Sequence, residues 1–445
     1  MCAINFGNMN IGSIPLPIRQ EDIPGLIVKE TENFYTLMPN PTKTITDKAP
    51  ITGQPPIFSP TQLYEADQKR KYQELYTICD PRTKQNLQRL AMSGKLSSTD
   101  SNDGTSTLDN LHRLATTPRY EGLNKDLLIK ETIEELANPF CITQKFGNVP
   151  KLMENSIINF ENSLKGTELE PAGFTTSTKK YDVKNSSTCP AASMQFSLAD
   201  KKPAEYARIA ADLSSPDALF TRKVKSSNIC PDKAQTFEIL KEFNTNFKPI
   251  ENSDDILITI KPDINALVRA QIQTLDRDNG ERSVNSVLMQ SAFMNLASEN
   301  SYNALTDKRY GKFNQNNEGL TELEKNFLES VIDDEPRISV VYQDVDDNQH
   351  IKGYNYSYEE TQNHLLKAIS QKKNVIVGLV NYDKKHKITN GHEITIIGAA
   401  KDLKGNIKFI CNDTDDNTTA PTFIPAKELI PRLHHAGIPA NILEQ

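Results

Sequence analysis

Long apolar runs are missing from this sequence of 445 residues, and none approaches the roughly 18 apolar residues of a membrane-spanning helix. The first residues, MCAINFGNMNIGSIPLPIRQ, also lack the cationic start and the unbroken apolar centre of a secretory signal. We therefore expect no membrane partner. The same absences predict a cytoplasmic protein, or one that is exported by a route independent of a signal peptide.

Cysteine is sparse and has no recognisable spacing. The six cysteines stand far apart, form no CxxC pair and show no Cys/His spacing suited to zinc. This distribution argues against a disulfide framework and a structural metal, and it predicts mostly reduced thiols. We expect neither a metal nor another cofactor. The cysteines are Cys2, Cys79, Cys141, Cys189, Cys230 and Cys411.

A basic cluster is missing as well. The formal net charge is −7, and Lys and Arg are spread among the acidic residues. Such a chain has no positive field that would hold a phosphate backbone, so nucleic acid is not an expected partner. The composition is 37% hydrophobic and 24% charged, which is typical of a globular protein with exposed connecting segments.

Residues 1–58 are rich in Pro, Asn, Thr and Ile and show no helical or strand period, so we expect an extended or disordered lead-in. Ser59, Pro60 and Gln62 then predict a helix start, and the helix is expected to reach about Cys79. Further helical patterns predict a small helical domain over residues 59–140.

Within that helical region, TDSNDGTSTLDN is similar in composition to a calcium-binding loop. Aligning Gly104 on the invariant glycine of such a loop puts Thr99, Ser101 and Asp103 at the first ligand positions and Asn110 at the bidentate one. This set has too few carboxylates for calcium. We interpret the segment as an Asp/Asn/Gly turn.

Residues 141–188 are polar with weak periodicity, and we expect a linker or an arm over the next domain. The segment 189–445 mixes helical and strand patterns and predicts an α+β domain with its sheet in the C-terminal third. Helices are expected at 190–200, 283–299 and 321–332, and strands at RISVVY, NVIVGLV, HEITIIGA and NIKFIC, the second of them central. Capping boxes are predicted at Thr321 with Glu324 and at Ser357 with Glu360.

The strands HEITIIGA and NIKFIC are joined by a short turn and predict an antiparallel hairpin. The hairpin would bring His392, at the start of one strand, close to Asn412 and Asp413 at the end of the other. An Asn or Asp that accepts the Nδ1 proton of His392 would fix its tautomer and leave Nε2 as a base. Strand alternation turns Asn412 and Asp413 to opposite faces, and we favour Asp413.

A nucleophile for this base is expected at a helix start, where the helix dipole and free backbone N–H groups favour a thiolate and stabilise an oxyanion. In NSSTCPAASMQFSLA, Pro190 is a good first helical residue, which puts Cys189 at or beside the N-cap. Cys230, in SSNICPD, repeats the Cys-Pro dipeptide and is a rival nucleophile, but a less helical segment follows it.

A Cys that opens a helix, then a His that opens a strand, then an Asn or Asp that closes the next strand resembles the papain-like cysteine peptidase superfamily. The hairpin is most similar to a bacterial branch whose strands read roughly GHAVTVVGY and end in NDP. The resemblance covers the Cys helix and residues 375–416. It implies a papain-like fold for residues 189–445, with a large helical insertion at about 200–335, preceded by the small helical domain. It also implies a protein or peptide substrate.

The chain departs from the family pattern before its cysteine. The family usually has an oxyanion Gln a few residues upstream, and KKYDVKNSST contains none. Asn185 is the nearest amide, and Gln144 in FCITQKFG is a more distant candidate that would have to fold back. The chain also has no Trp to shield the contact between the His and its Asn or Asp partner, so another apolar residue must do so.

His434 and His435 in LIPRLHHAGIP form a second conspicuous group, and Asp415 and Asp416 are possible partners for them in a metal site. Adjacent helical residues diverge by about 100°, so we prefer a helix whose C-terminus one of these histidines caps, ahead of Gly437. DVDDNQH, residues 344–350, predicts a polar hairpin turn.

The resemblance implies a thiol hydrolase that cleaves peptide or isopeptide bonds through Cys189, His392 and Asp413 or Asn412. A transglutaminase-type acyltransferase would use the same residues with an amine in place of water. The alternative from another class is an inactive papain-like fold that binds a partner protein. We favour the hydrolase.

Overall fold

The computed structural model describes most of the chain from residue 65 onward and two strands before it. For residues 26–31, 34–39 and 151–155 only the backbone is described. Ser59, Pro60, Gln62 and Asn185 lie outside the described residues. The described ranges are 26–31, 34–39, 65–146, 151–167, 186–275, 282–310, 319–402, 405–416 and 418–443.

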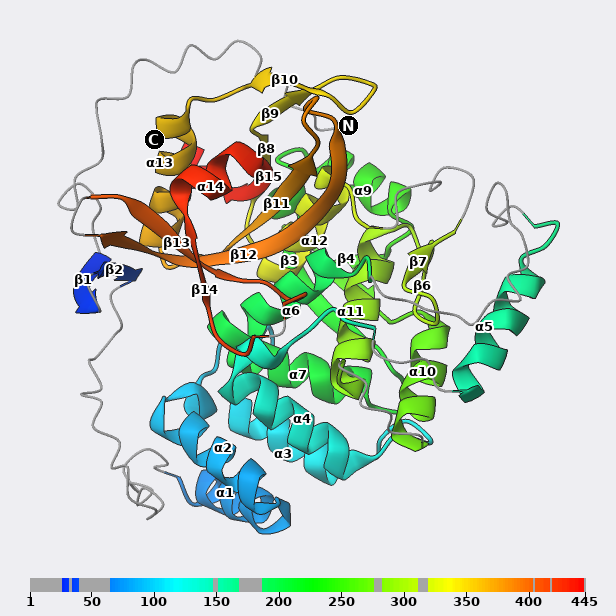
Figure 1. The fold of residues 1–445 in the computed structure, drawn as a ribbon. Coiled ribbons are helices and arrows are strands. Elements are labelled where there is room, and N and C mark those ends of the chain that lie inside the picture. The colour runs from blue at the N-terminus through cyan, green and yellow to red at the C-terminus, as the bar shows by residue number, and fades with distance from the viewer. Residues whose placement is uncertain are drawn as a thin grey trace.

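The fold is of the α+β class, as predicted, with most of the helices before residue 335 and most strands of an antiparallel main sheet after it (Figure 1). The first helices are α1 (Ala66–Ile78), α2 (Pro81–Met92), α3 (Thr107–Thr116), α4 (Lys125–Ala137) and α5 (Lys151–Ser163), with short 3-10 turns η3 (Lys95–Ser97) and η4 (Pro139–Cys141). The second group is α6 (Cys189–Lys201), α7 (Pro203–Leu213), α8 (Ser226–Ile229), α9 (Lys233–Glu242), α10 (Ile264–Leu275), α11 (Val284–Ala297) and α12 (Glu322–Asp333).

Small sheets lie among these helices. One is formed by β3 (Phe220–Lys225), β4 (Asn246–Pro249) and β5 (Asp255–Ile260), and another by β6 (Tyr302–Asn303) and β7 (Lys308–Arg309). The C-terminal third contains β8 (Arg337–Val341), β9 (Gln343–Val345), β10 (Ile351–Tyr354), α13 (Tyr358–Ser370), β11 (Val375–Tyr382), β12 (Ile388–Asp402), β13 (Ile407–Asn412), β14 (Thr422–Pro425), α14 (Ala426–Leu429), η6 (Ile430–Arg432), β15 (Leu433–Pro439) and α15 (Ala440–Leu443).

Local sequence signals set several helix starts. The capping boxes of α12 and α13 are confirmed, because each N-cap hydroxyl accepts the N3 backbone N–H and each N3 carboxylate accepts the N-cap N–H. Ser106 and Asp109 form a third box at α3 that the sequence analysis missed. The segment before it is a turn, in which Asp103 Oδ1 accepts the backbone N–H of Thr105 at 3.1 Å.

The helices before residue 140 have no hydrophobic core of their own. Leu87 and Leu111 belong to the same buried cluster as Met194, Tyr206 and Met289 from the later helices. Tyr206 also donates to Glu135 of α4 at 2.6 Å, which adds a buried polar link between the two groups. The expected boundary at residue 140 therefore does not separate two cores.

The main sheet has the strand order β1-β2-β12-β11-β15-β8, and β13 and β14 extend it from β12. The prediction that NVIVGLV is a central strand is confirmed, since β11 pairs with β12 on one side and with β15 on the other. β1 (Leu26–Thr31) and β2 (Phe34–Pro39) form an antiparallel pair within the predicted lead-in, and β2 pairs with β12. The sequence pattern predicts no strand in residues 1–58, and the first element that it predicts is the helix that begins near Ser59.

Helices cover both faces of this sheet (Figure 1). Leu365 and Ile369 of α13 pack with Val377 and Ile394 in one hydrophobic cluster, whereas Ile376 belongs to the larger cluster with α6, α11 and α12. The described residues thus form two large hydrophobic cores, one on each side of the sheet, which we call the helical core and the α13 core, and a smaller cluster that includes Phe146 and Ile272. α6 belongs to the helical core.

The helix predicted around His434 and His435 is wrong. Residues Leu433–Pro439 form β15, which lies between β11 and β8 in the sheet. Pairing on both sides satisfies the backbone N–H and C=O groups of this buried segment, which overrides its weak helical pattern. The predicted hairpin at DVDDNQH is confirmed, because β9 and β10 are antiparallel and the turn lies between them.

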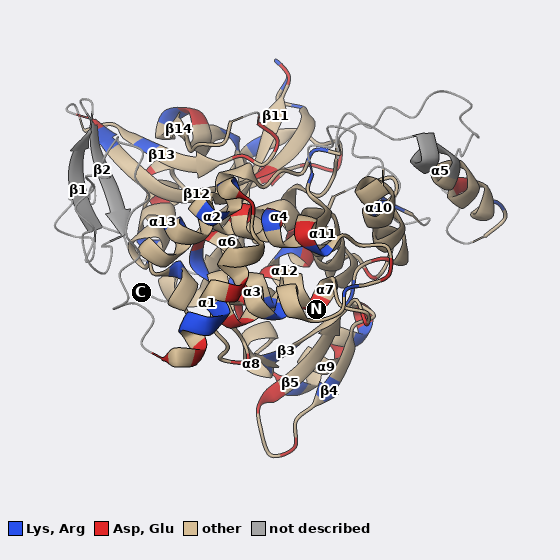
Figure 2. Cartoon of the chain, turned by 90° about the horizontal axis from the view of Figure 1, so that it is seen from below, with Lys and Arg blue, Asp and Glu red and all other residues tan. Residues whose placement is uncertain are grey.

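Charged positions of both signs occur along the same elements (Figure 2). On α1, for example, Arg70 forms ion pairs with Asp67 and Glu74 at 2.7 Å each. Among the described residues, no helix is both long enough and apolar enough to cross a membrane.

Candidate active site

Cys189 is the first residue of α6, and Pro190 follows it in the first turn, as predicted. The helix is buried from Pro190 to Ala199, whereas Cys189 itself is only partly buried and is a free thiol. The first N–H groups of a helix have no acceptor within the helix. The fold therefore presents the thiol at a helix start and supports it with a buried helix.

The segment that precedes Cys189 is held by a buried cluster of charged and polar groups. Asp307 accepts from Arg269 at 3.0 Å, from Arg282 at 2.7 Å and from Ser186 at 2.6 Å. Arg282 also donates to Thr188 Oγ1 at 3.0 Å. Burial raises the pKa of Asp307, but the positive charges of Arg282 and Arg269 lower it by more. The pKa of Asp307 is therefore below its ordinary value.

The β12–β13 hairpin brings His392 and Asp413 together, as the sequence predicted. His392 Nε2 lies 2.7 Å from Asp413 Oδ1, and Asp413 Oδ1 also accepts the backbone N–H of Asp415 at 2.9 Å. The predicted ring orientation is wrong, because Nε2 and not Nδ1 faces the carboxylate. Asn412 pairs with Thr395 in the sheet and is buried, and among the described residues its Nδ2 has no hydrogen-bond partner.

His392 has two partners that favour its charged form. Burial lowers the pKa of His392, but hydrogen bonds to Asp413 and Cys189 and the Coulombic interactions with both residues raise it well above its ordinary value. Burial raises the pKa of Asp413, and the hydrogen bond and charge of His392 bring it below its ordinary value. Together these two partners favour a charged imidazolium.

Gln144 folds back to the site, whereas Asn185 lies outside the described residues. The backbone N–H of Gln144 donates to Thr414 O at 3.0 Å, and its side-chain Oε1 accepts from Thr414 Oγ1 at 3.0 Å. Its Nε2 makes a long contact of 3.4 Å with Ser186 O. Gln144 therefore connects the loop beside Asp413 with the loop before Cys189.

Cys189, His392 and Gln144 all line one cavity of about 920 Å³. Carboxylates also reach this cavity, from Glu322, Glu393 and Asp347 among others, but no Lys or Arg lines it among the described residues. The cavity thus combines a reactive pair with acidic walls.

The other described cysteines do not resemble Cys189. Cys230 is buried, follows the short helix α8 and does not line the cavity with His392. Burial raises the pKa of Cys79 to about 11, and it raises the pKa values of Cys141 and Cys411 still further. Cys230 is disulfide-bonded and therefore not a thiol, and among the free thiols that the structure describes Cys189 alone is hydrogen-bonded to an imidazole.

The sequence analysis missed one group at the cavity. Glu322, at the start of α12, lies beside His434 and His435, whereas the expected partners were Asp415 and Asp416. Nothing in the spacing of Glu322 indicates this contact, because it depends on how α12 packs over β15.

Comparison of the chain with protein-family models, with curated proteins and with solved structures found no match. The geometry of Cys189, His392, Asp413 and Gln144 is therefore the basis for any functional assignment. A thiol and an imidazole that line one cavity, with a carboxylate bound to the imidazole, are the groups that nucleophilic catalysis at a carbonyl requires.

Proposed function

We propose that this protein is a papain-like thiol hydrolase that cleaves peptide or isopeptide bonds. The observation that carries the proposal is that His392 is hydrogen-bonded to both Asp413 and Cys189 and lines the same cavity as Cys189. The Cys helix against an antiparallel sheet and the long helical segment between Cys189 and His392 also agree with a papain-like domain that carries an insertion.

In the proposed reaction, the sulfur of Cys189 attacks the substrate carbonyl and forms a tetrahedral intermediate. His392 then protonates the leaving amine, and the acyl group remains on the sulfur as a thioester. Water, deprotonated by His392, attacks the thioester and releases the acid and the free thiol. Asp413 keeps the imidazole oriented and favours its protonated form.

Gln144 is the proposed side-chain donor to the oxyanion. Its amide has two N–H bonds, and the described contact of Nε2 with Ser186 O, at 3.4 Å, is too long to bind it strongly. The backbone N–H groups at the start of α6 would supply the other donor. Gln144 comes from the segment before α5, so it replaces the upstream Gln that KKYDVKNSST lacks.

Selective alkylation tests the proposal. At about pH 6, iodoacetamide should modify Cys189 far faster than Cys79, Cys141 or Cys411, because Cys189 is partly exposed beside an imidazole whereas burial raises the pKa values of the other three thiols. Mass spectrometry of peptides identifies the modified site. His392→Ala should remove the selectivity, and the matched control His112→Ala, on α3 and outside the cavity, should keep it.

Equal labelling of Cys189 and the buried thiols in the native protein would contradict the proposal. A labelled but catalytically silent protein would instead favour the binding-module alternative. Peptide and isopeptide substrate libraries with and without an added amine separate the hydrolase from the acyltransferase, because only the acyltransferase gives an amide product.

A further inference from the structure

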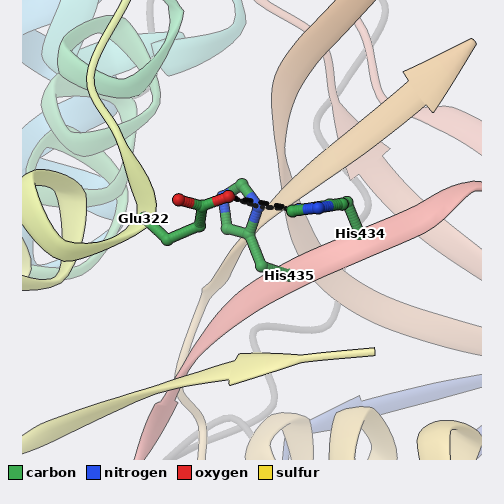
Figure 3. Close-up of side chains that lie close together, drawn as sticks. All are labelled: Glu322, His434 and His435. Atoms are coloured by element: carbon green, nitrogen blue, oxygen red, sulfur yellow. Dashed lines mark hydrogen bonds and ion pairs between the residues drawn. The ribbon is translucent and has the colours of Figure 1, made fainter. Parts of the chain in front are cut away.

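Three side chains converge on one point of the cavity wall: Glu322, His434 and His435 (Figure 3). The Nδ1 atoms of His434 and His435 are 2.9 Å apart. Oε1 of Glu322 lies 3.4 Å from Nδ1 of His434 and 3.8 Å from Nδ1 of His435. All three atoms are electron-pair donors when the imidazoles are neutral and the acid is ionised.

A β-bulge explains how two adjacent histidines point the same way. Gly378 of β11 pairs with His435, but the next residue of β11, Leu379, pairs with Leu433, so His434 is the extra residue in β15. A bulge re-aims one side chain of a strand. Adjacent side chains diverge on a regular helix, but the bulge allows His434 and His435 to point the same way. The expected divergence is therefore no argument against a metal site here.

The ring of His435 lies over a glycine. Glu393, Gly378 and His435 occupy one row across β12, β11 and β15, and a Cβ on Gly378 would overlap the His435 ring. Because Gly378 has no side chain, its two neighbours meet above it, and His435 Nε2 lies 2.8 Å from Glu393 Oε1. This is the distance of an ion pair, although the N–H is not aligned for a hydrogen bond.

Glu393 is the kind of outer carboxylate that metal-bound histidines commonly have. A carboxylate beside Nε2 favours the tautomer with the proton on Nε2, which leaves Nδ1 free to bind a metal. Glu393 is buried and also contacts Lys325 at 3.3 Å, so its position is fixed from the side of α12.

The spacing of the three donor atoms agrees with a small tetrahedral ion. Two ligands at the roughly 2.0–2.1 Å typical of zinc, held at a tetrahedral angle, lie about 3.3–3.4 Å apart. The observed separations of 2.9, 3.4 and 3.8 Å lie on both sides of that value. Two imidazoles and one carboxylate are also a ligand set that zinc uses when one position stays open.

We propose that Glu322, His434 and His435 bind a divalent transition-metal ion, with zinc as the best fit, and leave one coordination position open to the cavity. The donor set has no thiolate, which separates it from the reactive pair of Cys189 and His392 in the same cavity. The open position would take water or an oxygen of a substrate carboxylate or carbonyl. This inference does not depend on the proposed hydrolase activity.

Calorimetric titration of the metal-stripped, full-length protein with Zn²⁺ tests the inference. We expect one ion per chain in the native protein and in Cys189→Ala. We expect an affinity lower by about 10²-fold or more in His434→Ala, His435→Ala and Glu322→Gln, since each removes a direct ligand. His112→Ala is the matched control, because it removes a histidine that lies outside the cavity and should leave the affinity unchanged.

Cobalt substitution gives a readout that does not need a variant. Co²⁺ in the proposed site should show the visible absorption of a tetrahedral ion without the near-ultraviolet charge-transfer band of a thiolate ligand. The inference fails if the native protein does not bind Zn²⁺, if the three ligand variants bind it normally, or if binding is lost in Cys189→Ala. The last outcome would place the ion on the thiol and leave the thiol-hydrolase proposal to be judged by alkylation alone.

Discussion

Nε2 of His392 lies 2.7 Å from Oδ1 of Asp413, while the same imidazole also bonds to Cys189. The imidazole therefore has both a carboxylate and a thiol as hydrogen-bond partners. The contact with Asp413 orients the imidazole, which makes Asp413 a positioning residue whose loss can be recognised.

Asp413→Asn should lower the turnover number by about 10²-fold or more, because the imidazole loses both its orientation and the charge that favours imidazolium. The pH at which His392 loses its proton should fall at the same time, since Asp413 helps to raise its pKa. The pH profile of iodoacetamide labelling at Cys189 measures this change. Asn412→Ala, at the neighbouring position, should leave the pH profile unchanged, and a shift in that variant would reassign the role.

His392 should also make stability depend on pH. Its pKa in the folded protein is raised above the unfolded value of about 6.5, so the stabilisation is fully present below about pH 6.5 and declines as the pH rises toward the folded value. We expect the free energy of unfolding of the native protein to exceed that of His392→Gln at acidic pH, with the difference shrinking in alkali. Denaturant titrations at several pH values measure it. A difference that grows with rising pH would show that His392 is neutral in the folded state.

Gln144→Ala should lower the turnover number by about 10²-fold with little change in KM, because an oxyanion donor acts in the transition state rather than in substrate binding. Asn390→Ala is the control, since Asn390 is an exposed amide that lines the same cavity. If Gln144→Ala raised KM alone, the residue would bind substrate and not the oxyanion.

Gly378→Ala should disturb the His435 ring without touching its ligand atoms directly. The added methyl group would overlap the imidazole, so we expect a loss of about 1–3 kcal/mol in the free energy of unfolding together with weaker Zn²⁺ binding. Gly353→Ala, at a strand position with open space around the new Cβ, should change stability by less than about 0.5 kcal/mol. If both variants lost the same free energy of unfolding, the loss would come from replacing a glycine in the backbone and not from overlap with the His435 ring.

Asp307→Asn should destabilise the protein by about 3–5 kcal/mol, because Arg269 and Arg282 would stay buried without a counter-charge. Asn tolerates the positive φ of 50° at this position, so the backbone is not the cause. Exposed Asp67→Asn, which also faces an arginine, should cost far less stability, because water screens that ion pair. Thermal unfolding followed by circular dichroism compares them.

Much of the site could be predicted because its parts depend on local patterns. The Cys189 helix start follows from Pro190 and the apolar face behind it, and the His392–Asp413 contact follows from a short hairpin, whose register is set within a few residues. The α+β class and the central place of β11 follow from strand periodicity in the same way.

The parts that could not be predicted depend on packing between distant segments or on a local irregularity. Gln144 reaches the site through its contacts with Thr414 and Ser186, and Glu322 reaches His434 because α12 crosses β15. The bulge at His434 has no sequence signature of its own. The weak hydrophobic period of β15 predicts a helix only when the two strands that flank β15 in the sheet are left out of account.

The reactive contact joins the two hydrophobic cores. Ala191 and Met194 fix the thiol's helix in the helical core, whereas Ile394 and Ile396 fix the imidazole's strand in the α13 core. A slight sliding of one core over the other would separate sulfur from nitrogen while every helix stayed intact. On gradual heating, the reactivity of Cys189 should therefore decline before the circular dichroism signal does, because the two cores separate before the helices unfold.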